Sequence, residues 1–143
     1  MKKIFAIFPI LLCIILVSCR HQDNYSFLNN RNEISNISIV MLSFDDAGQI
    51  VETELQQIES IDSFLEDFQN VNCYTYYGDP LGITEEGVEA NVIKIVYRNN
   101  EYELINWNGQ ATYTNETGFR YYAGYNVFDE IQFNSLIQSY ILD

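Results

Sequence analysis

Three cysteines carry the most reactive side chains of this 143-residue chain, and their positions assign them different chemistry. Cys19 follows Ser18 directly after a short apolar stretch, so its thiol could begin a processed chain and carry a covalent group. Cys13 lies inside that stretch and is removed with it, which leaves no pair for an internal disulfide. Cys73 lies in the apolar and aromatic run 71–74, which is typical of a buried, unreactive thiol.

The first 18 residues indicate an export signal. Lys2 and Lys3 form a basic start, and residues 4–17 are apolar apart from Pro9. A helix of about 14 residues spans about 21 Å, which is shorter than a hydrocarbon core of about 30 Å. The segment therefore predicts a signal peptide. The alternatives are a secretory leader with a chance cysteine and a true transmembrane anchor.

The run Leu16-Val17-Ser18-Cys19, placed after a basic start and an apolar stretch, resembles the lipobox of bacterial lipoproteins. The resemblance implies export, cleavage before Cys19, and acyl chains on the Cys19 thiol at the extracytoplasmic face of the cell membrane. Two acyl chains give stable anchoring where one does not, because each buried CH₂ contributes about 0.8 kcal/mol. The chain as a whole is similar to small uncharacterised lipoproteins of Gram-positive bacteria, a resemblance that implies no activity.

The pattern divides the chain into a signal peptide over 1–18, a flexible tether over 19–33 and a single domain over 34–143. The tether is expected because its residues are polar and have no periodicity. The chain has 20 acidic and 7 basic residues, and removing the leader with its two lysines makes it more acidic still. Such a charge repels nucleic acid and anionic lipid heads, and it favours basic partners or serves solubility.

Side chains for metal or catalytic chemistry are sparse beyond the leader. The single histidine, His21, lies in the tether, so no zinc site and no Ser-His-Asp set is expected in the domain. The acids of the loop over 79–89 lack the ligand spacing of an EF-hand, and solvated side chains are the simpler interpretation. No carboxylate pair has an apolar setting that would favour acid–base catalysis. We expect no enzyme activity, no metal and no cofactor.

Aromatic residues offer the remaining candidate site. Tyrosines crowd two of the expected strands, and alternate strand residues point to opposite faces, so these side chains cannot all lie in a core. Exposed Tyr and Trp side chains form contact surfaces for proteins or sugars, although tyrosine is also simply a good strand residue. The candidate binding residues are Tyr74, Tyr76, Trp107, Tyr113, Tyr121 and Tyr122.

The hydrophobic pattern predicts an α+β fold, with a mostly antiparallel sheet of about six strands and two short helices in the order ββαββββα. Helices are expected over 60–68 and 129–141, where apolar residues recur at helical spacing after the capping residues Ser60 and Asp129. The strands are expected over 37–42, 50–58, 71–77, 92–97, 102–107 and 119–128.

The pair Asn99-Asn100 predicts a two-residue turn between two of these strands, because asparagine tolerates positive φ. This turn sets a register in which Ile95 faces Leu104 on the core side. Glu103 then lies opposite Val96 on a mixed face that is partly wet.

The leading hypothesis is a non-enzymatic binding module, held at the membrane by lipid on Cys19, whose acidic, tyrosine-bearing surface contacts a protein partner. A second hypothesis is an inhibitor or immunity protein against a basic extracellular enzyme or toxin, since charge would steer that encounter. A third is a cell-wall or carbohydrate hydrolase that uses paired carboxylates. Nucleic acid is not an expected partner.

Overall fold

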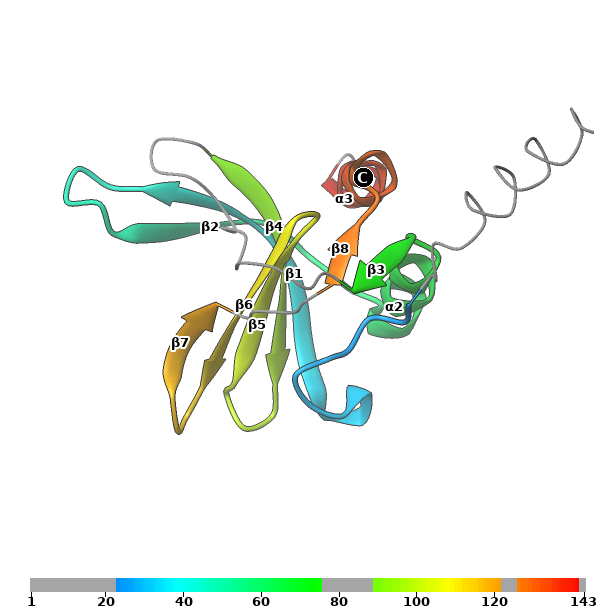
Figure 1. The fold of residues 1–143 in the computed structure, drawn as a ribbon, viewed down its shortest axis with the longest axis horizontal. Coiled ribbons are helices and arrows are strands. Elements are labelled where there is room, and N and C mark those ends of the chain that lie inside the picture. Colours follow the sequence, from blue (N-terminus) through cyan, green and yellow to red (C-terminus); the bar gives the residue numbers. More distant parts are fainter. Residues whose placement is uncertain (1–22, 76–88, 122–125, 142–143) are drawn as a thin grey trace, which may run out of the picture.

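A computed structural model describes residues 23–75, 89–121 and 126–141, which form an α+β fold (Figure 1). A six-stranded antiparallel sheet has the order β2-β1-β4-β5-β6-β7, and a small sheet pairs β3 with β8. The predicted class, a mostly antiparallel sheet with two helices, is confirmed. The strands are β1 (Ile34–Phe44), β2 (Ile50–Gln57), β3 (Cys73–Thr75), β4 (Ala90–Tyr97), β5 (Tyr102–Asn106), β6 (Gly109–Thr114), β7 (Gly118–Tyr121) and β8 (Asn126–Phe128).

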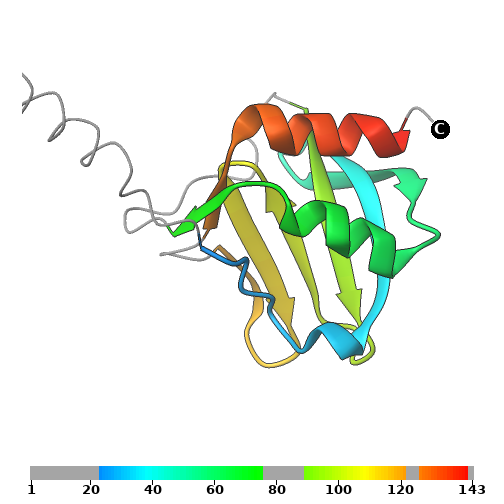
Figure 2. The same ribbon diagram turned by 90° about the vertical axis from the view of Figure 1, so that its right-hand side faces the viewer.

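Both helices begin where a capping side chain precedes an apolar stripe. The Ser60 hydroxyl accepts a backbone N–H at the start of α2 (Ile61–Gln69). The Asp129 carboxylate accepts one at 3.0 Å at the start of α3 (Glu130–Ile141). Figure 2 shows the helices running in opposite directions across one face of the main sheet. The buried stripe residues are Phe64, Leu65, Phe68, Phe133, Leu136 and Ile137.

The main core lies between the helices and the sheet. Ile37 of β1 pairs with Ile95 of β4, and Ile39 pairs with Ile93, and all four side chains are fully buried. This burial of apolar surface is the main stabilising contribution to the fold. A second, smaller apolar cluster lies on the opposite face of the sheet and consists of Val40, Leu42, Val92, Leu104 and Ala111.

The turn between β4 and β5 has three residues, so the expected two-residue turn at Asn99-Asn100 is wrong. The backbone N–H of Tyr97 donates to the carbonyl of Glu101 at 2.8 Å, and the second asparagine has a φ of 66°. A tight turn followed by one left-handed residue is the usual three-residue hairpin loop. Asn100 does adopt the expected positive φ, but it is the last residue of the three-residue loop 98–100.

The extra loop residue shifts the pairing of β4 with β5 by one position. Ile95 pairs with Glu103, and Lys94 pairs with Leu104. The expected register, in which Ile95 faces Leu104, is therefore wrong. Glu103 turns toward the core, whereas Lys94 and Leu104 take the opposite face of the sheet.

Residues 23–33 lie against the domain, which differs from the flexible tether expected over 19–33. The rings of Tyr25 and Phe27 meet edge to face with centroids 4.9 Å apart, and both pack with Leu28 on the main core. Burial of these three apolar side chains offsets part of the cost of ordering the segment. Because the rest of the segment is polar, the sequence did not indicate that it packs on the core.

Backbone contacts also hold this segment. The N–H of Asp23 donates to the carbonyl of Cys73 at 2.9 Å, and the Asp23 carboxylate accepts the N–H of Thr75 at 2.8 Å. A 3₁₀ helix, η1 (Arg31–Glu33), then leads directly into β1. The segment is therefore joined to both the small sheet and the main sheet.

Two strand assignments differ from the sequence prediction. The expected strands do not include β6, which pairs with β5 from Asn106 and Gly109 outward through a turn at residues 107–108. The single strand expected over 119–128 is wrong, because β7 pairs with β6 and β8 pairs with β3 in the other sheet. Hydrophobic alternation does not reveal which sheet a strand joins. Residues 76 and 77 of the expected third strand lie outside the described residues.

Candidate functional site

A row of apolar and aromatic side chains crosses the face of the main sheet that points away from the helices. Strand pairing places Val96 beside Tyr102, Tyr102 beside Tyr113, and Tyr113 beside Phe119. These four residues are called the aromatic row. The rings of Tyr102 and Tyr113 stack with centroids 5.2 Å apart and an angle of 10° between planes, and Phe119 is 39 % exposed. Half-exposed rings of this kind can be buried by a partner.

Opposite charges border the aromatic row. The Lys94 ammonium lies 4.6 Å from the centre of the Tyr102 ring, within the range of a cation–π contact, and it forms an ion pair with Glu52 of β2. Burial raises the pKa of Tyr102, and the negative charge of Glu52 raises it further. The row therefore has neutral, hydroxyl-bearing rings next to a charged pair, which suits a mixed apolar and polar contact.

The observed pairing of β4 with β5 explains why this site was not predicted from the sequence. The expected pairing placed Tyr102 on the core face, whereas the observed pairing places it beside Val96 on the outer face. Lys94 and Phe119 were not selected because the candidates were limited to tyrosine and tryptophan. The pairing of Tyr113 with Phe119 follows from the β6–β7 hairpin, and β6 was itself missed.

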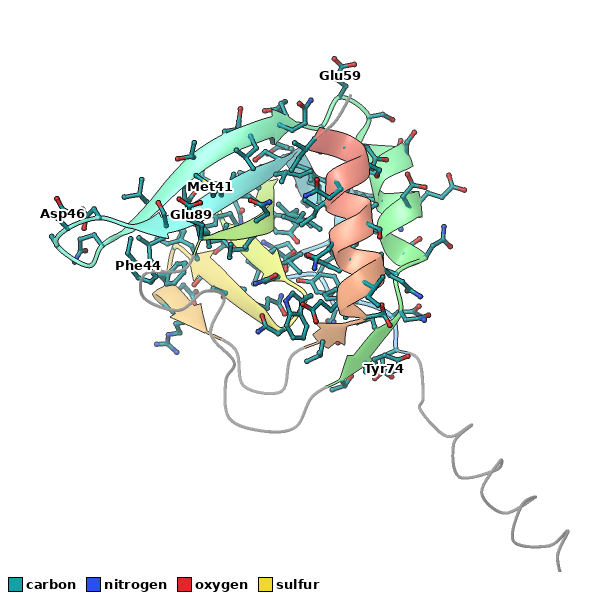
Figure 3. The ribbon with its side chains drawn as sticks, turned by 90° about the horizontal axis from the view of Figure 1, so that it is seen from above. Met41, Phe44, Asp46, Glu59, Tyr74 and Glu89 are labelled. Atoms are coloured by element: carbon teal, nitrogen blue, oxygen red, sulfur yellow. The ribbon has the colours of Figure 1, made fainter. Side chains whose placement is uncertain are left out.

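The candidate binding residues do not form one surface in the described part of the chain. Tyr113 lies in the aromatic row. Trp107 packs beside the main core on the helix side, and Tyr74 lies on β3, paired with Val127 in the small sheet. Figure 3 shows Tyr74 at the opposite end of the domain from Asp46 at the tip of the β1–β2 hairpin. The structure therefore does not bring these three residues together on one surface.

The other three candidates can be placed only in part. Tyr121 ends β7, and its backbone pairs with Ala111 of β6. Its side chain, like Tyr76 and Tyr122 as a whole, lies outside the described residues.

A buried carboxylate, Glu103, forms a second cluster on the helix side of the sheet. It is 0 % exposed. One carboxylate oxygen accepts hydrogen bonds from the Tyr25 hydroxyl at 2.5 Å and from the Gln110 amide at 2.8 Å. The other accepts from the Tyr97 hydroxyl and, at 3.4 Å, from the backbone N–H of Leu28. Two of the four donors belong to the segment that precedes η1.

Burial dominates the protonation chemistry of this cluster. Burial raises the pKa of Glu103, and the hydrogen bonds from Tyr25, Tyr97, Leu28 and Gln110 lower it by less. The pKa values of both tyrosines are raised, first by burial and then by the charge of Glu103. A raised carboxyl pKa is a common mark of a general acid. Because Glu103 has no exposed surface and both its oxygens are engaged, the arrangement serves instead to hold the N-terminal segment on the sheet.

The part of the chain that the structure describes holds no group of three or more His, Cys, Asp or Glu side chains placed to share a metal ion. In that same part, none of the helices combines the length and the apolar character needed to cross a bilayer. Comparison of the chain with protein-family models, with curated proteins and with solved structures finds no match. The function proposed below therefore comes from geometry and chemistry alone.

Proposed function

We propose that this protein is a lipid-anchored binding module of the extracytoplasmic membrane face. In this proposal it contacts a protein partner through the aromatic row and the acidic groups beside it, without catalysing a reaction. The observation that carries the proposal is the Tyr102–Tyr113 stack, half-buried on the face of the sheet that the helices leave uncovered. Tyrosine rings are amphipathic and lose little conformational entropy on binding, so they are common at protein interfaces.

The N-terminal attachment supports a fixed presentation of this surface. The backbone of Asp23 is hydrogen-bonded to β3, and Asp23 lies only four positions after Cys19. A chain of four residues reaches at most about 14 Å. Acyl chains on Cys19 would therefore hold the β3–β8 end of the domain close to the lipid. The hairpin tip at Asp46, which lies at the other end, would point away from the membrane (Figure 3).

Photo-cross-linking in native envelopes tests the proposal. A photoreactive amino acid replaces Phe119, and the control replaces Tyr74, which lies at the other end of the domain. We expect a cross-linked partner protein from position 119 that Tyr113→Ala weakens and that is absent from position 74. Equal capture at both positions, or capture of nothing above background, would count against the aromatic row as a binding surface.

The lipid anchor is tested separately. Cys19→Ala protein should lose incorporation of labelled palmitate, because the acyl chains would be carried by the Cys19 thiol. The control is Cys73→Ala, which should still incorporate the label. Palmitate incorporation by Cys19→Ala protein that remains with the membrane would contradict the anchor without bearing on the aromatic row.

A further inference from the structure

Strand β2 has a free edge within the described part of the chain. It is the outermost strand of the main sheet, and seven of its eight residues are exposed. Natural proteins usually protect such edges with lysine, proline or a bulge that turns the edge away. The sequence of β2 contains no lysine and no proline, and its one register irregularity comes after Glu54. Three of its aliphatic side chains are instead between 37 % and 40 % exposed, namely Ile50, Val51 and Leu55.

The hairpin turn determines which backbone groups of β2 face outward. The N–H of Asp45 donates to the carbonyl of Gln49 at 2.9 Å, so these two residues form a hydrogen-bonded pair. Bonded and non-bonded pairs alternate along an antiparallel ladder. Ile50, Glu52 and Glu54 therefore point their backbone N–H and C=O groups away from β1. This outward row ends at the irregularity opposite residues 39 and 40 of β1.

Charge selects the kind of strand that could occupy this edge. The sequence contains no Lys, Arg or His between Arg31 and Lys94, and the hairpin carries Asp45, Asp46 and two glutamates of β2. Lys94 pairs with Glu52, which leaves the acids at the hairpin tip without a described cationic partner. A second copy of this chain would bring like charges together across the edge, which is unfavourable. A basic strand would bring opposite charges together.

We propose that β2 accepts an extended, basic segment of the partner protein as an additional strand of the main sheet. Backbone groups of Ile50, Glu52 and Glu54 would pair with that segment, and its lysines or arginines would face the acids of the hairpin. Its apolar side chains would cover Val51 and Leu55. The inference rests on the proposed binding function and names the chemistry of the partner.

A proline substitution isolates the backbone contribution. Glu54→Pro removes an N–H that faces away from β1, so the existing ladder is kept, and proline is tolerated at such edge positions. Glu54→Ala removes the same charge and keeps the N–H, which makes it the matched control. Similar unfolding midpoints for the two variants establish that both fold.

The probe is a synthetic eight-residue peptide of alternating lysine and valine, and the control peptide has glutamate in place of lysine. Added to full-length protein in detergent, the lysine peptide should slow amide hydrogen exchange at Ile50, Glu52 and Glu54. It should bind Glu54→Pro about tenfold more weakly than Glu54→Ala, since at least one hydrogen bond is lost. Equal binding to the two variants, or binding without protection at β2, overturns the strand addition. Wild-type exchange data decide this even if Glu54→Pro does not fold.

Further outcomes separate this inference from the proposed function. If envelope cross-linking from position 119 captures the same partner in wild-type and Glu54→Pro protein, strand addition is wrong and the binding module stands. If neither protein captures a partner, the proposed function fails. A dimer of the wild-type chain that Glu54→Pro abolishes would assign the edge to a second copy and overturn the basic partner. Support requires that the cross-linked partner peptide be basic and that Glu54→Pro weaken its capture.

Discussion

Ile95 and Glu103 lie directly opposite each other on β4 and β5, so a carboxylate occupies a core position of the main sheet. A buried charge is costly unless it is hydrogen-bonded. The cost is offset by four donors, and two of these, the Tyr25 hydroxyl and the Leu28 N–H, come from the N-terminal segment. Glu103 therefore couples the stability of the sheet to the docking of residues that precede it by more than seventy positions.

Replacing Tyr25 by phenylalanine tests this coupling. Tyr25→Phe keeps the ring, which packs on Phe27 and Phe68, and removes the hydroxyl that donates to Glu103. A buried acceptor that loses one donor costs about 1–3 kcal/mol. We expect a decrease of this size in the free energy of unfolding, measured by urea denaturation. Tyr113→Phe, at a half-exposed position on the outer face of the sheet, is the control and should change it by less than about 0.5 kcal/mol.

The free energy of unfolding should depend on pH partly through the ionisation of Glu103. Its pKa is higher in the folded protein than in the unfolded chain, mainly because of burial. The folded state then binds its proton more tightly, so its contribution to stability is full below the unfolded pKa. That contribution is lost as the pH rises through the folded value. Glu103→Gln should remove this part of the pH dependence.

The measurement compares the free energy of unfolding of wild-type and Glu103→Gln protein from about pH 4 to pH 8. The difference between the two curves should change through the interval above the normal glutamate pKa. A difference independent of pH would contradict the raised pKa. Glu101→Gln is the informative control because hydrogen bonds from Asn29, Asn115 and Asn99 lower the pKa of that exposed carboxyl. The contribution of Glu101 should be full above the normal glutamate pKa and decrease only at the acid end of the range, where its slope is opposite in sign.

Local sequence signals predicted the class of the fold and both helices correctly. The stripe Phe64, Leu65 and Phe68 after Ser60 defines α2 by spacing and capping, and both are properties of neighbouring residues. The assignment of strands to sheets depends on contacts between distant residues. Strands β7 and β8 look like one strand in sequence because nothing local states that β8 pairs with Cys73–Thr75.

The candidate site was predictable only in part, and a single loop residue explains much of the difference. Tyr113 was selected as a binding residue and lies in the aromatic row. Tyr102 was assigned to the core face because a two-residue turn at 99–100 would place it there. With the observed three-residue loop, Tyr102 lies on the outer face of the sheet and Glu103 lies on the core face. A sequence window cannot distinguish the two loops, since asparagine suits the left-handed position of either.

The left-handed residue of that loop should respond to substitution in a graded way. Asn100 has a φ of 66°, a region in which a side chain with a Cβ costs about 1–2 kcal/mol. Asn100→Gly should be neutral or slightly stabilising, whereas Asn100→Val should lower the free energy of unfolding by at least that amount. Asn99→Val serves as the control for the added side chain. Equal effects of the two valine substitutions would indicate that the loop does not require the left-handed conformation.

The reactivity of Cys73 reports whether the N-terminal segment stays docked. Burial raises the pKa of the Cys73 thiol to about 12, and the charge of Asp23 adds to this. The thiolate is the reactive form, so alkylation by iodoacetamide at pH 8 should be at least about a hundredfold slower in the native protein than in urea. Protein expressed without residues 1–18 and carrying Cys19→Ala has Cys73 as its sole thiol.

Asp23→Ala separates opening of the segment from the charge of Asp23. It removes the acceptor of the Thr75 N–H, which should loosen the segment. Loss of the Asp23 charge also lowers the pKa of Cys73, so both effects increase alkylation in this variant. Tyr25→Phe keeps the Asp23 charge and loosens the same segment through Glu103. Faster alkylation in both variants, at an unchanged global unfolding rate, would show that Cys73 is exposed by undocking of residues 23–30. Faster alkylation in Asp23→Ala alone would assign the effect to charge and leave the segment docked.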